Sequence, residues 1–258
     1  MRATNELFNR IRRLAGRAIG DFNLIEDGDR IAVGVSGGKD SYTLLHVLEA
    51  LRKKAPIHYE LVAVNIDAGF PGYRKDLIEQ HLQQQRFSFR MEKTESYQVI
   101  EEKLRPGSTY CAFCARLRRG VLYTVAEQLG CNKIALGHHL DDLVETLLLN
   151  QFYVGTLAAM SARLEADNGK HVVIRPLVYV EEKDIAAFSR LKGFPIVHCS
   201  CPVAGQEDQK RQRMKRLIAD LAGEIPQIRN SMISAIGNVH PRHLLDQKLV
   251  GTNREEHF

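Results

Sequence analysis

Short apolar runs alternate with longer segments of helical periodicity along most of the chain. Strands are expected where apolar residues are contiguous, and helices where they recur three or four positions apart. The expected strands cover residues 30–35, 60–66, 87–92, 133–136, 172–174 and 196–197. The expected helices cover residues 4–20, 44–51, 77–85, 114–129, 142–152 and 182–192. This alternation predicts an α/β fold, a doubly wound parallel sheet with helices on both faces.

The pattern changes near Gln206, because the two helices expected at 209–221 and 227–236 have no strand between them. We therefore expect a division into three parts. These are an N-terminal basic helix (1–27), a central α/β domain (28–205) and a helical C-terminal extension (206–258). Parallel sheets of this kind bind ligands beyond the carboxyl ends of their strands. Ser36, Asp67 and Gly137 each follow an expected strand and are therefore candidates for a site.

The composition is that of a globular protein. Hydrophobic residues make up 44% of the 258 residues, which is enough for a large core. The net charge of +5 permits a polyanionic partner but is also typical of an ordinary soluble surface. The polar N-terminus and the absence of a long apolar run predict a cytoplasmic protein without a membrane partner. In that compartment the five cysteines stay reduced and can bind metal.

A glycine-rich loop lies between an expected strand and an expected helix, at Ser36-Gly-Gly-Lys-Asp-Ser41. Its glycines allow close backbone approach to a phosphate, its two serines can donate hydrogen bonds and Lys39 adds positive charge. It is not a Walker A loop, because Val33 and Asp40 occupy positions that need Gly and Ser or Thr. It resembles the PP-loop, Ser-Gly-Gly-x-Asp-Ser, of the ATP pyrophosphatase superfamily. The resemblance implies ATP binding with Asp67 near the nucleotide. Asp40 is a candidate for holding Mg²⁺, with helix capping as the alternative.

Two cysteine groups are candidates for a metal site. Cys111-Ala-Phe-Cys114 opens an expected helix and fits a redox pair, half of a zinc site or part of an iron–sulfur site. Cys199 and Cys201 follow the last expected strand. Three thiolates on a four-iron cluster leave one iron open for an external ligand such as sulfide. We favour Cys111, Cys114 and Cys201 as ligands, with Cys199 as the substitute, although a four-thiolate zinc site stays open.

The combined motifs resemble the tRNA 2-thiocytidine biosynthesis proteins over about residues 7–246. The segments that carry the resemblance are Ser36–Ser41, Cys111–Gly120, Leu136–Asp142, Arg175–Leu177 and Asn238–Leu244. The resemblance implies an adenine nucleotide alpha hydrolase-like fold of the PP-loop type and use of ATP, Mg²⁺ and a [4Fe-4S] cluster. In that chemistry ATP adenylates the C2 oxygen of cytidine 32 in the tRNA anticodon loop. Sulfide carried on the open iron then attacks C2 and AMP leaves.

This sequence departs from the family near the downstream cysteines. Cys199-Ser-Cys201-Pro-Val-Ala-Gly-Gln206 stands where the family has Cys-x-x-Cys-Gly-Ser-Gln, so the identity of the third ligand is open. The run from Cys201 to Ala204 resembles Cys-Pro-Tyr-Ser of the related thiouridine enzymes, which favours Cys201.

The candidate site residues fall into two groups besides the cysteines. Nucleotide contacts are assigned to Ser36, Gly37, Gly38, Lys39, Asp40, Ser41, Asp67, Gly137 and His138. Catalytic roles are assigned to Lys39, Arg118, Asp141 and Asp142. The expected partners are tRNA and a cysteine desulfurase or other sulfide donor, and a homodimer is an open option. Arginines on the first helix, after Cys114 and on the C-terminal helix are candidates for a tRNA groove, although each alone is typical of a solvated face.

Three alternatives stay open. One is a tRNA 2-thiouridine synthetase of the same superfamily. Another is a PP-loop enzyme of the amidating or lysidine type, with cysteines that bind structural zinc. The last is a basic RNA-binding module that uses ATP only for structure.

Overall fold

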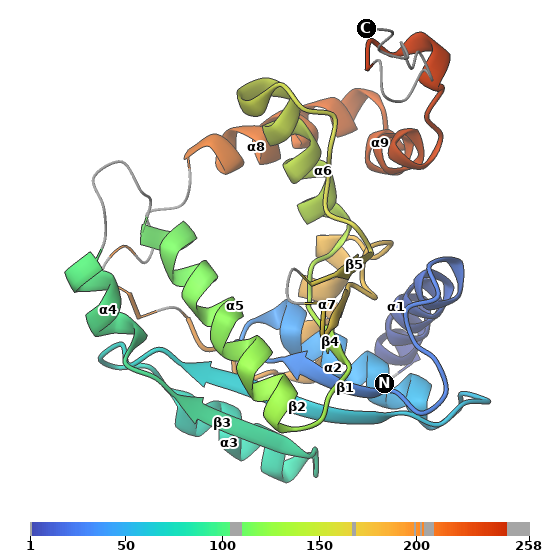
Figure 1. Cartoon of the computed structure of the whole chain (residues 1–258). Helices are drawn as coiled ribbons and strands as arrows, with labels where there is room; N and C mark the ends of the chain where they lie inside the picture. Colours follow the sequence, from blue (N-terminus) through green and yellow to red (C-terminus); the bar gives the residue numbers. More distant parts are fainter. Residues whose placement is uncertain are drawn as a thin grey trace, which may run out of the picture. The chain divides into compact units, whose positions relative to one another are not determined.

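A six-stranded sheet forms the centre of the computed structural model, which describes residues 2–103, 110–166, 169–198, 200, 201, 203 and 209–246. The strand order is β3-β2-β1-β4-β6-β5 (Figure 1). The strands are β1 (Arg30–Gly34), β2 (Glu60–Asp67), β3 (Phe89–Lys93), β4 (Lys133–Ala135), β5 (Arg163–Glu165) and β6 (Val172–Ile174). Every described pairing is parallel except that of β5, which runs antiparallel to β6 at the edge. The predicted parallel α/β sheet is confirmed.

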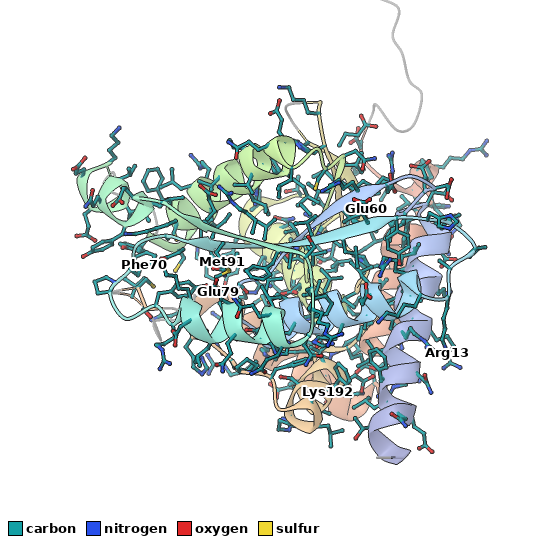
Figure 2. All side chains as sticks on the ribbon, turned by 90° about the horizontal axis from the view of Figure 1, so that it is seen from below. Arg13, Glu60, Phe70, Glu79, Met91 and Lys192 are labelled. Atoms are coloured by element: carbon teal, nitrogen blue, oxygen red, sulfur yellow. The ribbon has the colours of Figure 1, made fainter. Side chains whose placement is uncertain are left out.

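Helices cover both faces of the sheet (Figure 2). The described helices of the chain are α1 (Arg2–Asp21), α2 (Lys39–Arg52), α3 (Lys75–Gln84), α4 (Ser96–Lys103), α5 (Tyr110–Gln128), α6 (Leu140–Leu149), α7 (Glu182–Lys192), α8 (Gln209–Glu224) and α9 (Ile228–Gly237). Most of α6, and nearly all of α8 and α9, belong to a separate compact unit, which is described below. Helix α5 packs on one face and pairs with α4, whereas α2 and α3 pack on the other. Helices α1 and α7 pack against α2 and against each other. The arrangement is doubly wound, as expected.

The core on the α5 face shows how the apolar spacing produces this packing. Leu122, Val125 and Ala126 lie one helical turn apart and pack against apolar side chains of β1, β2 and β4. On the opposite face Leu44, Leu45 and Leu48 of α2 are fully buried. Complete burial of each such leucine contributes roughly 1.5–3 kcal/mol. This packing fixes α2 and α5 against the strands whose carboxyl ends carry the candidate site.

The chain divides into two compact units. One comprises Met1–Leu143 and Met160–Gln209 and contains the sheet. The other comprises Val144–Ala159 and Lys210–Phe258, and within it Arg211 donates to the buried Glu145 at 2.6 Å. The three-part division proposed from sequence stays a prediction. Among the described helices, none combines the length and apolar character needed to cross a bilayer.

Two expected elements are wrong. Residues 196–197 form no strand; instead the N–H of Val197 donates to the carbonyl of Gly37 at 3.0 Å, so this extended segment is bound to the glycine-rich loop. The helix expected to reach residue 152 ends at Leu149 and continues as a π-helical turn over Asn150–Val154, which Gly155 ends with a φ of +76°. Pattern analysis also missed α4 and β5, which carry few buried apolar residues.

Candidate nucleotide and metal site

The glycine-rich loop joins β1 to α2 at the carboxyl edge of the sheet. Gly37 has a φ of +85°, and a Cβ there would lie 2.9 Å from side-chain carbons of Ile78 and Val197. Only glycine fits this position without displacing its neighbours. Gly38 is the N-cap of α2, so the unpaired N–H groups of the first helical turn lie where a phosphate can approach.

Hydrogen bonds fix the loop before any ligand arrives. Ser41 Oγ donates to the Gly38 carbonyl at 2.9 Å, and the Gly38 N–H donates to Ser36 Oγ at 3.4 Å. The amide of Asn65 donates to the Val35 carbonyl at 2.7 Å. Sequence reasoning missed Asn65. Asn65 is the one amide in an otherwise apolar strand. A buried amide is stable in such a place only if it has a hydrogen-bond partner, and this could have marked Asn65 as a structural contact of the loop.

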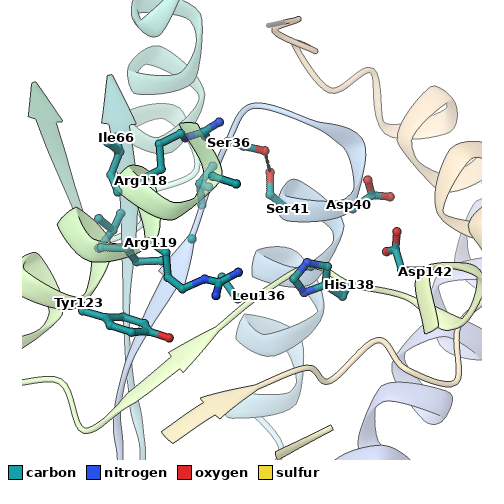
Figure 3. Close-up of a pocket in the computed structure, with 16 residues that line it drawn as sticks. Ser36, Asp40, Ser41, Ile66, Arg118, Arg119, Tyr123, Leu136, His138 and Asp142 are labelled. Atoms are coloured by element: carbon teal, nitrogen blue, oxygen red, sulfur yellow. Dashed lines mark hydrogen bonds between the residues drawn. The ribbon is translucent and has the colours of Figure 1, made fainter. Parts of the chain in front are cut away.

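A pocket of about 390 Å³ lies beside the loop (Figure 3). One part of its lining is apolar, from Val64, Ile66, Leu122 and Leu136, and the rest is polar or charged. The predicted site residues in its lining are Ser36, Asp40, Ser41, Arg118, Gly137, His138 and Asp142. Residues from four separate segments therefore meet at the carboxyl ends of β1, β2 and β4, as the sheet topology predicts.

Two carboxylates lie at one end of this pocket, across from the α5 arginines (Figure 3). His139 is buried between them, with Nε2 3.4 Å from Asp142 Oδ2 and 3.7 Å from Asp40 Oδ1. Asp40 Oδ1 is buried and receives no hydrogen bond of normal geometry from the described residues, although Lys39 Nζ lies 3.2 Å away. Such carboxylate oxygens suit Mg²⁺. Asp142 also accepts the N–H of His139 at 2.9 Å and thereby caps α6.

Three other predicted residues lie beside the pocket without lining it. Asp141 Oδ2 accepts the N–H of Glu182 at 2.7 Å, so it caps α7. Lys39 Nζ lies 3.2 Å from Asp40 and 3.1 Å from Glu182. Asp67 accepts the N–H of Gly69 at 2.9 Å, and its other oxygen lies 3.3 Å from Lys75. Asp141 and Asp67 thus fix backbone beside the pocket, whereas Lys39 pairs with two carboxylates.

An arginine fixes the ring of His138. Arg175 Nε donates to His138 Nδ1 at 3.1 Å, so a neutral His138 carries its proton on Nε2. Burial, and then the positive charge of Arg119, lowers the pKa of Arg175, but an arginine remains protonated under any ordinary condition. His138 therefore presents a donor at the pocket wall.

Two of the three predicted cluster cysteines lie in one apolar cluster. Cys114 and Cys201 are both buried there with Ala68, Phe70 and Ile100. The pKa of the Tyr110 phenol is raised to about 12, first by burial and then by the nearby Glu101. Cys201 and Cys114 also lie close enough to contribute to this increase.

The other cysteines are placed differently. Cys111 is exposed and precedes Cys114 by one turn of α5, and Cys199 lies outside the described residues. Cys131 packs in the separate core beneath α5. No three described His, Cys, Asp or Glu side chains surround a single metal position. Each thiolate of a four-iron cluster binds a different iron, so Cys111, Cys114 and Cys201 need not surround one common metal position to hold such a group.

A second pocket of about 190 Å³ lies on the other side of the loop. Ser36, Ile66 and Arg118 line both pockets. Ala68 and Phe70 line the second pocket and also pack in the cluster that contains Cys114 and Cys201. The two pockets therefore share a wall at Ser36 and Arg118, and the second pocket also borders the cluster that contains the two thiols.

Some of the basic residues proposed for a tRNA groove have partners within the protein. Arg10 forms an ion pair with Asp184, and Arg17 pairs with Asp21 and lies over the ring of Tyr179. Arg118 and Arg119 instead line the larger pocket.

Comparison with known proteins agrees with this geometry. Residues 8–215 match the PP-loop domain family. A tRNA-cytidine(32) 2-sulfurtransferase of Syntrophotalea carbinolica is 67% identical over 95% of both chains, and that of Geobacter sulfurreducens is 61% identical over 95% of both. The solved structure of the U34-tRNA thiolase NcsA from Methanococcus maripaludis, with its [4Fe-4S] cluster, matches with a TM-score of 0.74 at 18% identity. The match covers 92% of this chain and 81% of that one, and it supports the fold. The chain therefore belongs to the PP-loop domain family and, within it, to the family of tRNA-cytidine(32) 2-sulfurtransferases.

Proposed function

We propose that this protein is an ATP-dependent tRNA sulfurtransferase that converts cytidine 32 of the anticodon loop to 2-thiocytidine. The identity of 67% to a relative of that name along nearly the whole chain supports the assignment. The structural observation that supports the assignment most directly is that Arg118 and Ser36 each line two pockets. Both line the pocket beside the PP-loop and the pocket whose wall is shared with the Cys114–Cys201 cluster. Base activation and sulfur transfer need such adjacent compartments.

The first step is adenylation of the base. The C2 oxygen attacks the α-phosphorus of ATP and pyrophosphate leaves, which converts a poor leaving oxygen into the oxygen of AMP. The N–H groups at the start of α2 and the hydroxyl of Ser36 bind the departing pyrophosphate, while Ser41, which donates to the Gly38 carbonyl, holds the loop in shape. Arg118 stabilises the charge that develops on phosphate oxygens, and His138 donates from Nε2. Asp40 and Asp142 would hold the Mg²⁺ that shields the phosphates.

The second step replaces the activated oxygen. A [4Fe-4S] cluster held by Cys111, Cys114 and Cys201 would supply one iron without a protein ligand, at which sulfide can be kept ready. Sulfide attacks C2, the bond from C2 to oxygen breaks, and AMP carries the oxygen away. The apolar side chains around Cys114 and Cys201 exclude water from this region, which protects the activated base from hydrolysis.

The proposal includes partners and a location. The substrate is tRNA, and the sulfur comes from a cysteine desulfurase or another sulfide donor. The enzyme works in the cytoplasm, where the thiols stay reduced.

The test is thiolation in vitro. The full chain is reconstituted anaerobically with iron and sulfide and incubated with ATP, Mg²⁺, sulfide and unmodified tRNA that carries cytidine 32. Nucleoside mass spectrometry should detect 2-thiocytidine that depends on ATP, with none from the same tRNA carrying uridine 32. Formation of 2-thiouridine, or of no thiolated nucleoside by a protein that holds its cluster and binds ATP, would refute the proposal.

A further inference from the structure

The side chain of Lys39, the variable residue of the PP-loop, lies to one side of the pocket. Its Nζ is 3.1 Å from Glu182 Oε1 and 3.2 Å from either oxygen of Asp40. The described residues that line the larger pocket include Asp40 and Ser41 but not Lys39. The loop therefore presents Asp40 to the pocket, whereas Lys39 connects Asp40 to α7.

Glu182 is a firmly placed partner for Lys39. It is the first residue of α7, and its N–H donates to Asp141 Oδ2 at 2.7 Å. The segment before α7 is fixed as well, because the N–H of Leu140 donates to the carbonyl of Val180 at 3.0 Å. Helix α7 packs directly against α2. The carboxylate of Glu182 is thus attached to the framework that supports the loop.

The charges favour retention of this arrangement. The ammonium of Lys39 lies 3.2 Å from the Asp40 carboxylate and 3.1 Å from that of Glu182. Lys39 is therefore a cation bound between two anions. If it moved to a phosphate, two carboxylates would remain without their cation beside a pocket that receives a polyanion.

We infer that Lys39 and Glu182 act together as positioning residues that orient the Asp40 carboxylate for the divalent cation accompanying ATP, and that Lys39 does not bind the phosphates. This inference rests on the proposed use of ATP. With Nζ fixed by Glu182, the Asp40 carboxylate cannot rotate freely, and its Oδ1 stays where it receives no hydrogen bond of normal geometry from the described residues. An oxygen fixed in this way binds a cation at little entropic cost. The arrangement replaces the expectation that Lys39 contacts ATP directly.

Calorimetric titration of the full chain with ATP tests the pair, with and without Mg²⁺. Lys39→Met and Glu182→Gln should each weaken binding of ATP with Mg²⁺ by roughly tenfold, the usual effect of removing a partner that orients a metal ligand. The double variant should be no weaker than either single variant, because both remove the same interaction. Binding of ATP in EDTA should be unchanged in all three. Lys39→Arg should retain binding, because arginine also pairs with carboxylates.

A neighbouring glutamate provides the matched control. Glu181 precedes Glu182, but its carboxylate lies 2.6 Å from Lys183, so Glu181→Gln removes an equal charge from the same turn without touching Lys39. Its ATP binding should equal that of the wild type. The conservative Glu182→Asp serves as a second variant if Glu182→Gln lowers the melting temperature.

The outcomes separate this inference from the proposed function. If the wild-type protein binds no ATP, the proposed function itself is refuted. If the wild type binds ATP, weaker binding by Lys39→Met in EDTA would show that Lys39 contacts phosphate and would overturn the inference. Additive losses in the double variant, or stronger ATP binding by Glu182→Gln, would overturn it as well.

Discussion

Gly137 lies against Asp40 so closely that a Cβ on Gly137 would be 3.0 Å from the Asp40 carbonyl carbon. The other nearby atoms, the Asp40 oxygen and the Ser41 nitrogen, are also backbone atoms, at 3.1 Å. None of them can yield without moving the first turn of α2. The loop after β4 thus supports the end of the PP-loop, and glycine at 137 is a steric requirement.

Gly137→Ala should therefore displace the PP-loop. We expect a loss of about 1–3 kcal/mol in unfolding free energy, the usual cost of overpacking, and weaker ATP binding. Urea denaturation and ATP titration measure the two effects. Gly16→Ala is the control. Gly16 lies within α1, and a Cβ there would meet the Leu51 side chain of α2 at 3.6 Å, an ordinary contact distance. The control should keep ATP binding and gain up to about 1 kcal/mol. Wild-type ATP affinity in Gly137→Ala would contradict the steric argument.

Lys133 should be the most sensitive charge away from the site. Its side chain is 3% exposed, and its Nζ lies 2.7 Å from both Asp29, which is 4% exposed, and Glu26. Lys133→Met leaves the buried Asp29 carboxylate without its cation and should cost about 3–5 kcal/mol in urea unfolding. ATP affinity should not change, because Lys133 begins β4 at the end opposite the pocket. Arg30→Gln, which breaks the exposed Arg30–Glu60 pair, should cost under about 1 kcal/mol. Equal losses in the two variants would refute this account.

A half-buried histidine pair between α2 and α3 should make the free energy of unfolding depend on pH in the acid range. His46 Nε2 lies 3.1 Å from His81 Nε2, and burial, followed by His81 and Lys192, lowers the pKa of His46 to about 4. The folded pKa lies below the ordinary value of 6.5, so the unfolded chain takes up the proton first. Stability is therefore complete above pH 6.5 and is lost as the pH falls towards 4, by about 3 kcal/mol for this group.

Urea denaturation at pH 7 and pH 4.5 measures this loss. His46→Gln should reduce the difference between the two pH values, whereas His58→Gln, at a fully exposed side chain, should leave it as in the wild type. A His46→Gln protein with the wild-type difference would show that His46 is protonated equally in both states.

Cysteine substitutions should separate cluster ligands from a packing residue. We expect Cys111→Ser, Cys114→Ser and Cys201→Ser each to lose most bound iron and visible absorbance after anaerobic reconstitution. Cys131→Ala should keep both, because Cys131 packs in the other core, at a cost on the order of 1 kcal/mol. If Cys201→Ser keeps all its bound iron and Cys199→Ser loses it, then Cys199 rather than Cys201 is the third cluster ligand.

Most of the sheet was predictable because its strands are contiguous apolar runs with strong burial. Helix α7 matched its predicted bounds, Glu182–Lys192, because acidic residues open it and Gly193, with a φ of +63°, ends it. The edge strand β5 was missed because all three of its residues are exposed, so burial leaves no pattern. The apolar pair at 196–197 resembles a strand, but its Val197 N–H bonds to the loop rather than to the sheet.

The candidate site also has parts that the sequence identified and parts that it did not. The PP-loop and the Gly137–Asp142 segment were identifiable because their chemistry lies in contiguous residues. The pairing of Lys39 with Glu182 joins positions 143 apart in sequence, and that of His138 with Arg175 joins positions 37 apart. Local pattern holds no information about such contacts, since they depend on how α7 and β6 pack. Sequence therefore identified the participating residue types but not which side chains orient the others.

The hydrogen bond from Val197 to Gly37 joins the segment that leads to Cys201 to the glycine-rich loop. Val197 stands four residues before Cys201, so the chain that carries a candidate cluster ligand is tethered to the loop proposed to receive pyrophosphate. Val197 Cβ is also one of the atoms that a Cβ at residue 37 would meet at 2.9 Å. A side chain at residue 37 would therefore press on the segment that leads to Cys201 as well as reshape the phosphate loop, so one glycine serves both candidate sites.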